Sequence, residues 1–285
     1  MSFLDYDFMR RALVAALLVG LIAPAVGVFL VQRRLALIGD GLGHVAVTGV
    51  ALGLVIDRAP VLIALVTAVA GAIAIELIRA RGETGAEIAL AILFYGGIGG
   101  GVVLVSRAPS GSRSLNQYLF GSITTTSAGD LWAFVVLAAV VAGIVAVLGG
   151  ALFSVSNDEE FARASGLPVV RLNLLLATLT GITVVVSMRV VGVLLVSALM
   201  VVPVACAQLL ARSFRSTMAM SIAIGVAVSL AGVIVSYHAD TPSGATIVLL
   251  AVGLFVVALL VSRLGRRRSR RAASSAPEVA APVTG

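Results

Sequence analysis

Residues 172–211 read LNLLLATLTGITVVVSMRVVGVLLVSALMVVPVACAQLLA and contain one charged side chain, Arg189. A helix needs about 20 apolar residues to cross the roughly 30 Å hydrocarbon core of a membrane. This stretch is long enough for two crossings, which we place at 172–188 and 190–211, with the boundary at Arg189. It predicts a helical membrane protein.

The composition of the whole chain agrees with that class. Hydrophobic residues make up 60% of the 285 residues, charged residues make up 12%, and the mean hydropathy is +1.14. Soluble domains average about 45–50% apolar and about 25% charged residues, so a soluble protein of this composition would lack polar surface. Disorder is excluded because the apolar content is high almost throughout the chain.

Seven other segments have the length of a membrane crossing. We therefore predict an all-α, polytopic membrane protein with about nine transmembrane helices and a transmembrane domain over residues 1–262. The predicted segments are 8–31, 38–56, 59–78, 86–106, 131–152, 172–188, 190–211, 217–237 and 243–262. Many of the 30 glycines lie inside these segments, and small residues allow membrane helices to approach closely. The glycine-rich run at 96–101 predicts that the fourth segment makes a tight or bent crossing.

Arginine placement predicts the orientation of these segments. All 20 basic residues are Arg, and six of them lie within 263–271. Cytoplasmic loops are enriched in basic residues, so we place residues 263–285, a basic and then disordered tail, in the cytoplasm. Nine crossings then put the N-terminus outside, with 14 of the 20 arginines inside and the other 6 outside.

The first segment also admits a second interpretation as a signal peptide. Residues 10–11, both Arg, would begin the signal, and Ala-Pro-Ala at 23–25 would be its cleavage site. The apolar run continues past that site to Val31. We therefore favour a transmembrane helix.

Missing residue types exclude several chemistries. Without Lys, the chain has no P-loop for ATP hydrolysis and no Schiff-base catalysis. With Cys206 as its single cysteine, it forms no intrachain disulfide and no thiolate metal cage. The pI of about 10.9 does not indicate nucleic-acid binding, because the arginine cluster adjoins a membrane segment.

Asp40 and His44 are the candidate metal ligands. Asp40 follows Arg34 by six residues, which places it inside the second segment if the interval is helical. Residues four apart share a helix face, so Asp40, His44 and Thr48 form one polar stripe. Carboxylate and imidazole suit Zn²⁺, Mn²⁺ or Fe²⁺. The alternatives are a proton relay and a local Asp–His hydrogen bond that pins a helix crossing.

A second acid–imidazole pair, His238 and Asp240, lies before the last segment. The sequence around it, SYHADTPSG, is ordinary turn chemistry, so we favour a solvated turn. An outer-mouth metal contact is the functional alternative.

A short helix is predicted in the cytoplasmic stretch 157–167. Asn157 or Asp158 would cap it, acidic residues fill its first turn, and Gly166 would end it. A helix of this length cannot span a membrane, so it lies at the surface or docks into a partner.

Several motifs resemble the permease subunits of zinc, manganese and iron ABC importers. RRLALIGDGLGH at 33–44, followed by GVALG at 49–53, is similar to the second-span region of that family. Weaker matches in the same order are YLFG at 118–121, EFARASG at 160–166, VVGVLLVSAL at 190–199 and DTPSG at 240–244. The resemblance covers roughly 3–262. This chain has Val45 where the family often has Ala.

The resemblance implies a homodimer in the bacterial inner membrane that imports a divalent metal ion by alternating access. ATP hydrolysis would occur in a separate ABC ATPase subunit, so the chain itself would not be an enzyme. An extracytoplasmic binding protein would deliver the metal, which is a substrate and not a bound cofactor. The resemblance places Asp40 and His44 on the translocation path. It assigns ATPase coupling to Asp158, Glu159, Glu160, Ala162, Arg163 and Gly166.

We therefore predict the permease of an ATP-driven metal importer, which contacts membrane lipid and no nucleic acid. Two alternatives stay open. An ion-coupled secondary transporter would use Asp40 and His44 as a relay and need no ATPase. A membrane scaffold subunit would tolerate apolar replacement of both residues.

Overall fold

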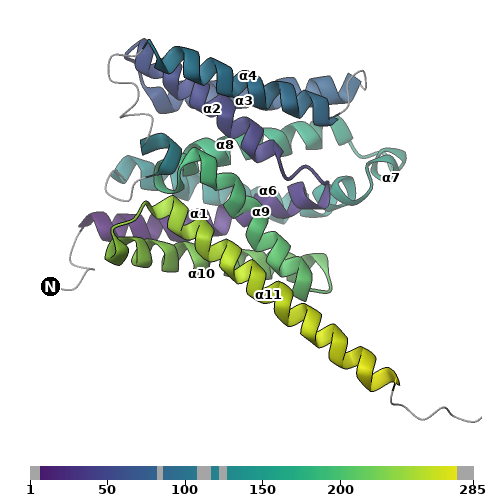
Figure 1. Cartoon of the computed structure of the whole chain (residues 1–285). Coiled ribbons are helices and arrows are strands. Elements are labelled where there is room, and N and C mark those ends of the chain that lie inside the picture. The colour runs from purple at the N-terminus through teal and green to yellow at the C-terminus, as the bar shows by residue number, and fades with distance from the viewer. Residues whose placement is uncertain (1–6, 82–85, 108–116, 122–126, 275–285) are drawn as a thin grey trace, which may run out of the picture.

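The computed structural model describes residues 7–81, 86–107, 117–121 and 127–274, and within them every regular element is a helix. Figure 1 shows their arrangement. The helices are α1 (Asp7–Gln32), α2 (Ile38–Val55), α3 (Pro60–Arg81), α4 (Ala86–Val105), α6 (Ala128–Asn157), α7 (Glu159–Ala164), α8 (Val169–Val191), α9 (Val193–Leu210), α10 (Phe214–Ala239) and α11 (Ser243–Ser274). Residues 117–120 add one helical turn.

Eight of these helices are long and apolar enough to cross a membrane, and α9 is a shorter apolar helix. Each of the nine predicted segments corresponds to one of these eight helices or to α9. The predicted boundary at Arg189 is wrong by a few residues, because α8 continues to Val191 and the break falls at Gly192. Gly192 has φ +89° and ψ 144°, a conformation that residues with a side chain rarely adopt.

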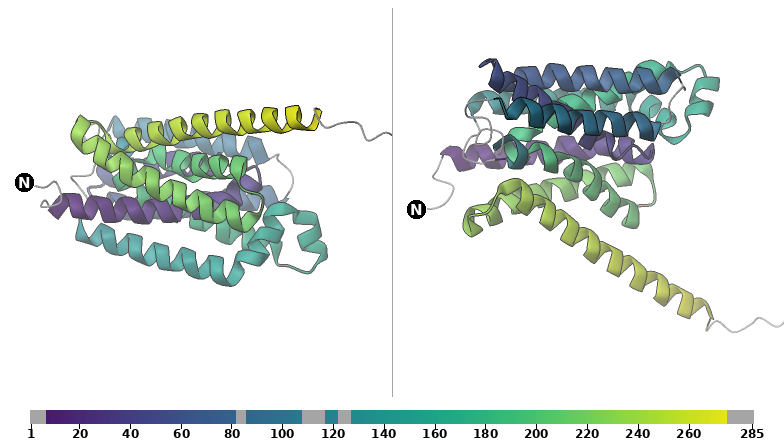
Figure 2. Two further views of the ribbon diagram at one scale, coloured as in Figure 1. Left: turned by 90° about the horizontal axis from the view of Figure 1, so that it is seen from below. Right: turned by 45° about the horizontal axis from the view of Figure 1, so that its top comes forward.

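Three helices form the centre of the bundle. α1, α8 and α2 are buried over most of their apolar length, whereas α4, α6 and α11 are mostly exposed. α2 packs between α3 and α4, and α1 packs against α6, α9 and α10. The two further views in Figure 2 show the same layering, with α11 on the outside. The exposed apolar faces are those that would meet lipid.

Small residues bring α1 and α10 together. A Cβ built on Gly20 would lie 2.7 Å from the Gly225 carbonyl oxygen, so the two backbones touch. One turn further along α1, residues 23–25 are buried in the bundle. The signal-peptide interpretation is therefore not supported, since the cleavage site that it requires is part of the core.

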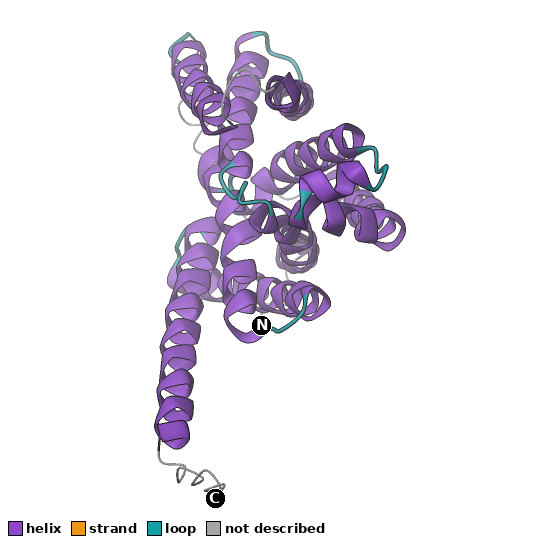
Figure 3. Ribbon diagram, turned by 90° about the vertical axis from the view of Figure 1, so that its right-hand side faces the viewer, coloured by secondary structure: helices purple, strands orange, loops and turns teal. Residues whose placement is uncertain are grey.

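The ends of the bundle agree with an odd number of crossings. The first residues of α1 lie on one side of the molecule, and the last residues of α11 lie on the opposite side (Figure 1). α7 lies on the same side as the last residues of α11. Figure 3 shows α11 projecting beyond the other helices. It runs through the basic stretch to Ser274, and residues 275–285 lie outside the described part of the chain.

An ion pair ties two helices at the end opposite α7. Arg189, in the last turn of α8, places its Nη1 2.6 Å from Oδ1 of Asp130, in the first turn of α6. Ser127 and Asp130 also form a capping box at the start of α6. Trp132 beside them is 71% exposed, as expected of an aromatic residue at a membrane interface.

Candidate functional site

Asp40 lies in the first turn of α2, and not one and a half turns into a longer helix. α1 ends at Gln32, and residues 33–37 form turns before α2 begins at Ile38. Arg34 in this connection has φ +59°. The six-residue interval from Arg34 to Asp40 is therefore not helical throughout. The partial positive charge of a helix N-terminus favours a carboxylate in this position.

The predicted polar stripe is present on α2. Asp40, His44 and Thr48 are each partly exposed, whereas most of the intervening residues are buried. The buried residues of α2 include Gly39, Gly41, Leu42, Gly43, Ala46 and Val47. The stripe is thus the side of α2 that the other helices cover least.

α4 packs on one flank of the stripe. The His44 ring meets Phe94 edge-on at 4.4 Å between centroids, and Thr48 Oγ1 donates a hydrogen bond of 2.6 Å to the Gly97 carbonyl oxygen. A Cβ built on Gly97 would lie 2.7 Å from the His44 carbonyl carbon. The glycine-rich run at 96–101 therefore makes a tight crossing, as predicted.

α9 packs on the other flank. A Cβ built on Gly39 would lie 3.3 Å from Ser197 Oγ and 3.5 Å from Met200 Sδ. Ser197 is buried, and among the described residues its hydroxyl has no hydrogen-bond partner. Ser197 is not among the site residues predicted from the sequence. Its signal is weak, because a single Ser in an apolar helix is common.

One copy of the chain offers few metal ligands. In the described part of the chain, no three His, Cys, Asp or Glu side chains gather in one place. Asp40 and His44 do not hydrogen-bond to each other within those residues, so the pinning interpretation loses its support. Two side-chain ligands fall short of the four found in closed zinc sites.

His238 and Asp240 lie at the end of the bundle opposite α7. Asp240 has a left-handed conformation, φ +50°, and caps the C-terminus of α10. His238, in the last turn of α10, has its ring 5.4 Å from that of Tyr237. This geometry is that of a helix end at the surface, and it does not bring the pair together with Asp40 and His44.

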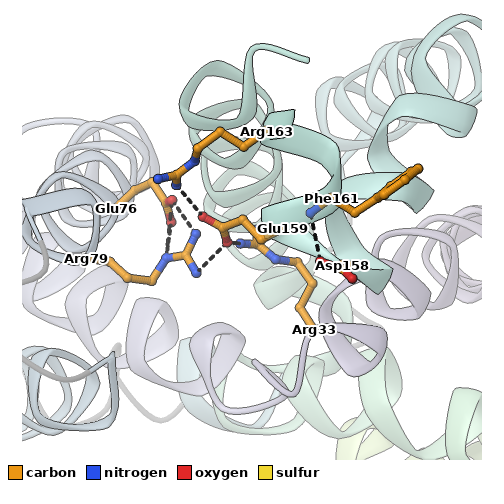
Figure 4. Close-up of polar contacts among 7 residues, drawn as sticks. All are labelled: Arg33, Glu76, Arg79, Asp158, Glu159, Phe161 and Arg163. Atoms are coloured by element: carbon orange, nitrogen blue, oxygen red, sulfur yellow. Dashed lines mark hydrogen bonds and ion pairs between the residues drawn. The ribbon is translucent and has the colours of Figure 1, made fainter. Parts of the chain in front are cut away.

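The short helix predicted within 157–167 is α7. Asp158 caps it by accepting a 2.9 Å hydrogen bond from the Phe161 backbone N–H, and Gly166 follows it with φ +80°. Ala162 is fully buried. Phe161, which is not in the predicted coupling set, is 65% exposed and points away from Glu159 and its arginine partners (Figure 4).

Glu159 faces the opposite way, into a cluster of arginines. Its Oε2 lies 2.9 Å from Nη2 of Arg33 and 3.4 Å from Nη1 of Arg79, and its Oε1 lies 3.3 Å from Nη2 of Arg163. Arg79 in turn pairs with the buried Glu76 at 2.7 Å. Figure 4 shows Glu159 at the centre of these contacts. The cluster joins α7 to the ends of α1 and α3.

A cavity of about 650 Å³ adjoins the cluster, between α3, α7 and α8. Arg171 and Asn173 line it together with Glu76, Arg79 and Glu159. Asn173 is buried, and its Oδ1 has no partner among the described residues. The end of the molecule that carries α7 is therefore polar and open on this side of the helix.

Comparison with known proteins decides the family. Residues 5–262 match the ABC 3 transport family. The chain belongs to this family. It is thus a multi-span helical membrane protein of an ABC transport family, as predicted.

Relatives of this ABC 3 family member support that conclusion. A manganese transport system membrane protein of Halalkalibacterium halodurans is 32% identical and aligns over 91% of this chain and 89% of its own length. A manganese import system permease protein of Streptococcus gordonii is 29% identical over 94% of this chain and 96% of its own. The structure of PsaBC from Streptococcus pneumoniae in complex with Fab matches with a TM-score of 0.80 at 30% identity, over 90% of this chain and 92% of that one.

Proposed function

We propose that this chain is the membrane permease of an importer that moves a divalent metal ion inward, driven by ATP hydrolysis in a separate subunit. The observation that carries the proposal is the Asp40–His44 stripe, which is partly open on an otherwise buried helix. Charged groups inside membrane segments are costly and usually face a cavity or a path. In a member of an ABC transport family, such a stripe would line the path of a transported cation.

Manganese is the substrate that we favour. Two relatives are named as manganese transport or import proteins. Carboxylate oxygen with imidazole nitrogen suits Mn²⁺, Zn²⁺ and Fe²⁺ alike, so the choice among these three rests on the relatives, and a soft ion that needs thiolate is disfavoured. Cys206 is buried in α9 and supplies no exposed thiol. Zinc and iron are the alternatives that the experiment below separates.

A second copy of the chain would complete the site. Two-fold symmetry that brings both stripes together would supply two carboxylates and two imidazoles. Such a site would hold the ion only briefly, because conduction requires binding weak enough for release. The homodimer is part of the proposal.

The two ends of the bundle would serve different partners. The exposed Phe161 on α7 would anchor the ATPase subunit, since exposed aromatic residues are common anchors at protein interfaces. The opposite end, which carries the Arg189–Asp130 pair and the α10–α11 connection, would receive the metal from an extracytoplasmic binding protein. Movement between states open to either end would follow from the ATPase cycle.

Cellular metal content tests this function. In a strain that lacks the permease, grown in metal-limited medium, we expect manganese measured by mass spectrometry to fall and the wild-type chain to restore it. Asp40→Asn and His44→Ala should not restore it. Asp57→Asn is the matched control, since Asp57 is exposed in the α2–α3 turn with φ +52° and Asn tolerates that conformation.

The result also separates the alternatives. Loss of zinc or iron in place of manganese would change the substrate and keep the function. If no metal changes in the deletion strain, the importer proposal fails. Restoration by both variants would favour a scaffold, and metal uptake without any copurifying ATPase would favour a secondary transporter.

A further inference from the structure

Glu159 reaches across the bundle from α7 to the connection between α1 and α2. Its carboxylate lies 2.9 Å from the guanidinium of Arg33, which is 126 positions earlier in the chain. A second contact runs beside it, because Gln32 Nε2 donates a 3.2 Å hydrogen bond to Asn157 Oδ1 just before α7. Two contacts therefore join the start of α7 to the end of α1.

The Arg33–Glu159 pair is shielded from water on the Arg33 side. The Arg33 side chain is only 5% exposed, while that of Glu159 is 33% exposed. Burial, and then the nearby Arg79, lower the pKa of Arg33. Among the described residues, Glu159 is the one carboxylate within ion-pairing distance of Arg33. Glu159 is therefore the group that compensates the buried charge of Arg33.

The backbone connects Arg33 directly to the metal stripe. The Arg33 N–H donates to the Phe29 carbonyl oxygen, and the Leu35 N–H donates to that of Leu30. Leu35 in turn accepts from the Ile38 N–H, which begins α2 two residues before Asp40. The connection is five residues long, and its backbone is hydrogen-bonded to α1 and to the start of α2. A displacement of Arg33 would be passed to the first turn of α2.

We infer that Glu159 and Arg33 form the link through which α7 sets the position of Asp40. The inference rests on the proposed function and extends it to residues outside the metal stripe. α7 thus has two faces: Phe161 points outward toward a partner, and Glu159 points inward to α1. Glu159 and Arg33 are positioning residues, since neither is among the residues of the stripe.

The link would transmit a movement of α7 because each of its steps is a direct contact. When the partner subunit moves α7, the Glu159 carboxylate carries Arg33 with it, and the turn at 33–37 carries Asp40. Arg79 provides a second branch to α3, secured by the buried Glu76. Without the charge at Glu159, α7 would stay capped by Asp158 but would lose its ion pair with Arg33 at the end of α1.

The test uses the permease–ATPase complex in proteoliposomes, with manganese uptake and ATP hydrolysis measured in the same vesicles. For Glu159→Gln and Arg33→Gln we expect the ATPase subunit to copurify normally and ATP hydrolysis to continue. The number of ions moved per ATP should fall about tenfold, within the usual range of coupling between sites. Arg33→Lys, which keeps the charge, should recover most of the ratio. Arg171→Gln is the matched control, because Arg171 is exposed at the same end and makes no ion pair within the described residues.

A second readout follows the turn itself. Leu37 is 71% exposed in the connection, so a Leu37→Cys variant in a Cys206→Ala background can be labelled by a maleimide. In the complex that carries only the labelling substitutions, the labelling rate at Leu37→Cys should differ with and without ATP. When Glu159→Gln is added to that complex, the rate should be the same with and without ATP.

The results distinguish failure of the proposed function from failure of the Glu159–Arg33 link. A wild-type complex that moves no manganese, zinc or iron ends the proposed function itself. If the wild-type complex transports and both glutamine variants keep its ratio of ions to ATP, the link is wrong. A parallel fall in complex yield, ATP hydrolysis and uptake, at an unchanged ratio, would also overturn it, since that pattern indicates a structural role only.

Discussion

At the scale of single residues, the Arg33–Glu159 ion pair is asymmetric. Arg33 is almost fully buried, whereas Glu159 has about a third of its side chain exposed and two other arginines within ion-pairing distance. Removing one partner of a buried pair is costly because the other charge remains without compensation. The loss of Glu159 should therefore destabilise the fold more than the loss of Arg33.

This asymmetry predicts unequal effects on stability. Glu159→Ala should lower the free energy of unfolding by about 3 kcal/mol, the low end for a stranded buried charge. Arg33→Met should lower it by less, because Glu159 remains hydrated and paired. Thermal unfolding of the purified protein in detergent measures both changes. Equal losses for the two variants would contradict the burial of Arg33.

The sequence predicted the polar stripe of α2 at this scale but not its setting. Spacing alone placed Asp40, His44 and Thr48 on one face, because four-residue intervals are a property of every α-helix. The position of Asp40 in a first turn was missed. It depends on a non-helical connection that includes Arg34 at positive φ, and no residue there is a glycine or proline to signal it.

At the scale of helices, the α2–α4 crossing sets the shape of the stripe. Gly97 lies against the backbone of His44, while Gly99 on the same helix has open space where a side chain would be. The two glycines are two residues apart and face different ways. They form a matched pair for testing how closely α4 must approach.

Gly97→Ala should disturb the site, and Gly99→Ala should not. The new methyl at position 97 would collide with the His44 backbone, and overpacking of this kind costs about 1–3 kcal/mol. We expect Gly97→Ala to lower both the unfolding temperature and metal uptake, with Gly99→Ala close to wild type in both. If both variants behaved like wild type, α4 would not pack on His44 as described.

The break between α8 and α9 shows why helix boundaries resist prediction. Arg189 is the only charged residue in the stretch, so the sequence suggested a boundary there. The break occurs at Gly192 because other segments pack on it. Side chains at Gly121, Gly192 or Gly244 would collide with backbone atoms of neighbouring segments, and Ser243 Oγ donates to the Val190 carbonyl oxygen. Those contacts join residues far apart in the chain.

At the scale of the whole molecule, composition and the lengths of the apolar segments predict the class and the number of apolar helices, whereas arginine placement predicts only their orientation. Which helices pack together cannot be predicted in this way, because the packing depends on contacts such as Arg33–Glu159 between residues 126 positions apart. Hydrophobicity carries no information on which span lies beside which. The short helix α7 was predicted from its caps, yet its inward face was not, because Glu159 and Glu160 look equivalent in the sequence.

Assembly with the ATPase tests the outward face of α7. Phe161→Ala should reduce the amount of ATPase subunit that copurifies by about tenfold or more, since buried aromatic anchors often contribute over 2 kcal/mol to an interface. Val147→Ala is the control, because Val147 is even more exposed than Phe161, at 80% against 65%, but lies within the apolar part of α6. Normal copurification with Phe161→Ala would place the docking surface elsewhere.

ATP-driven metal uptake by the reconstituted complex, with the binding protein outside the vesicles and ATP inside, tests the proposed metal path most directly. The wild-type complex is predicted to accumulate manganese only when ATP is present. Asp40→Asn should abolish that accumulation while the ATPase subunit remains bound. Uptake by Asp40→Asn and His44→Ala at the wild-type rate would contradict the claim that the metal passes along this face of α2.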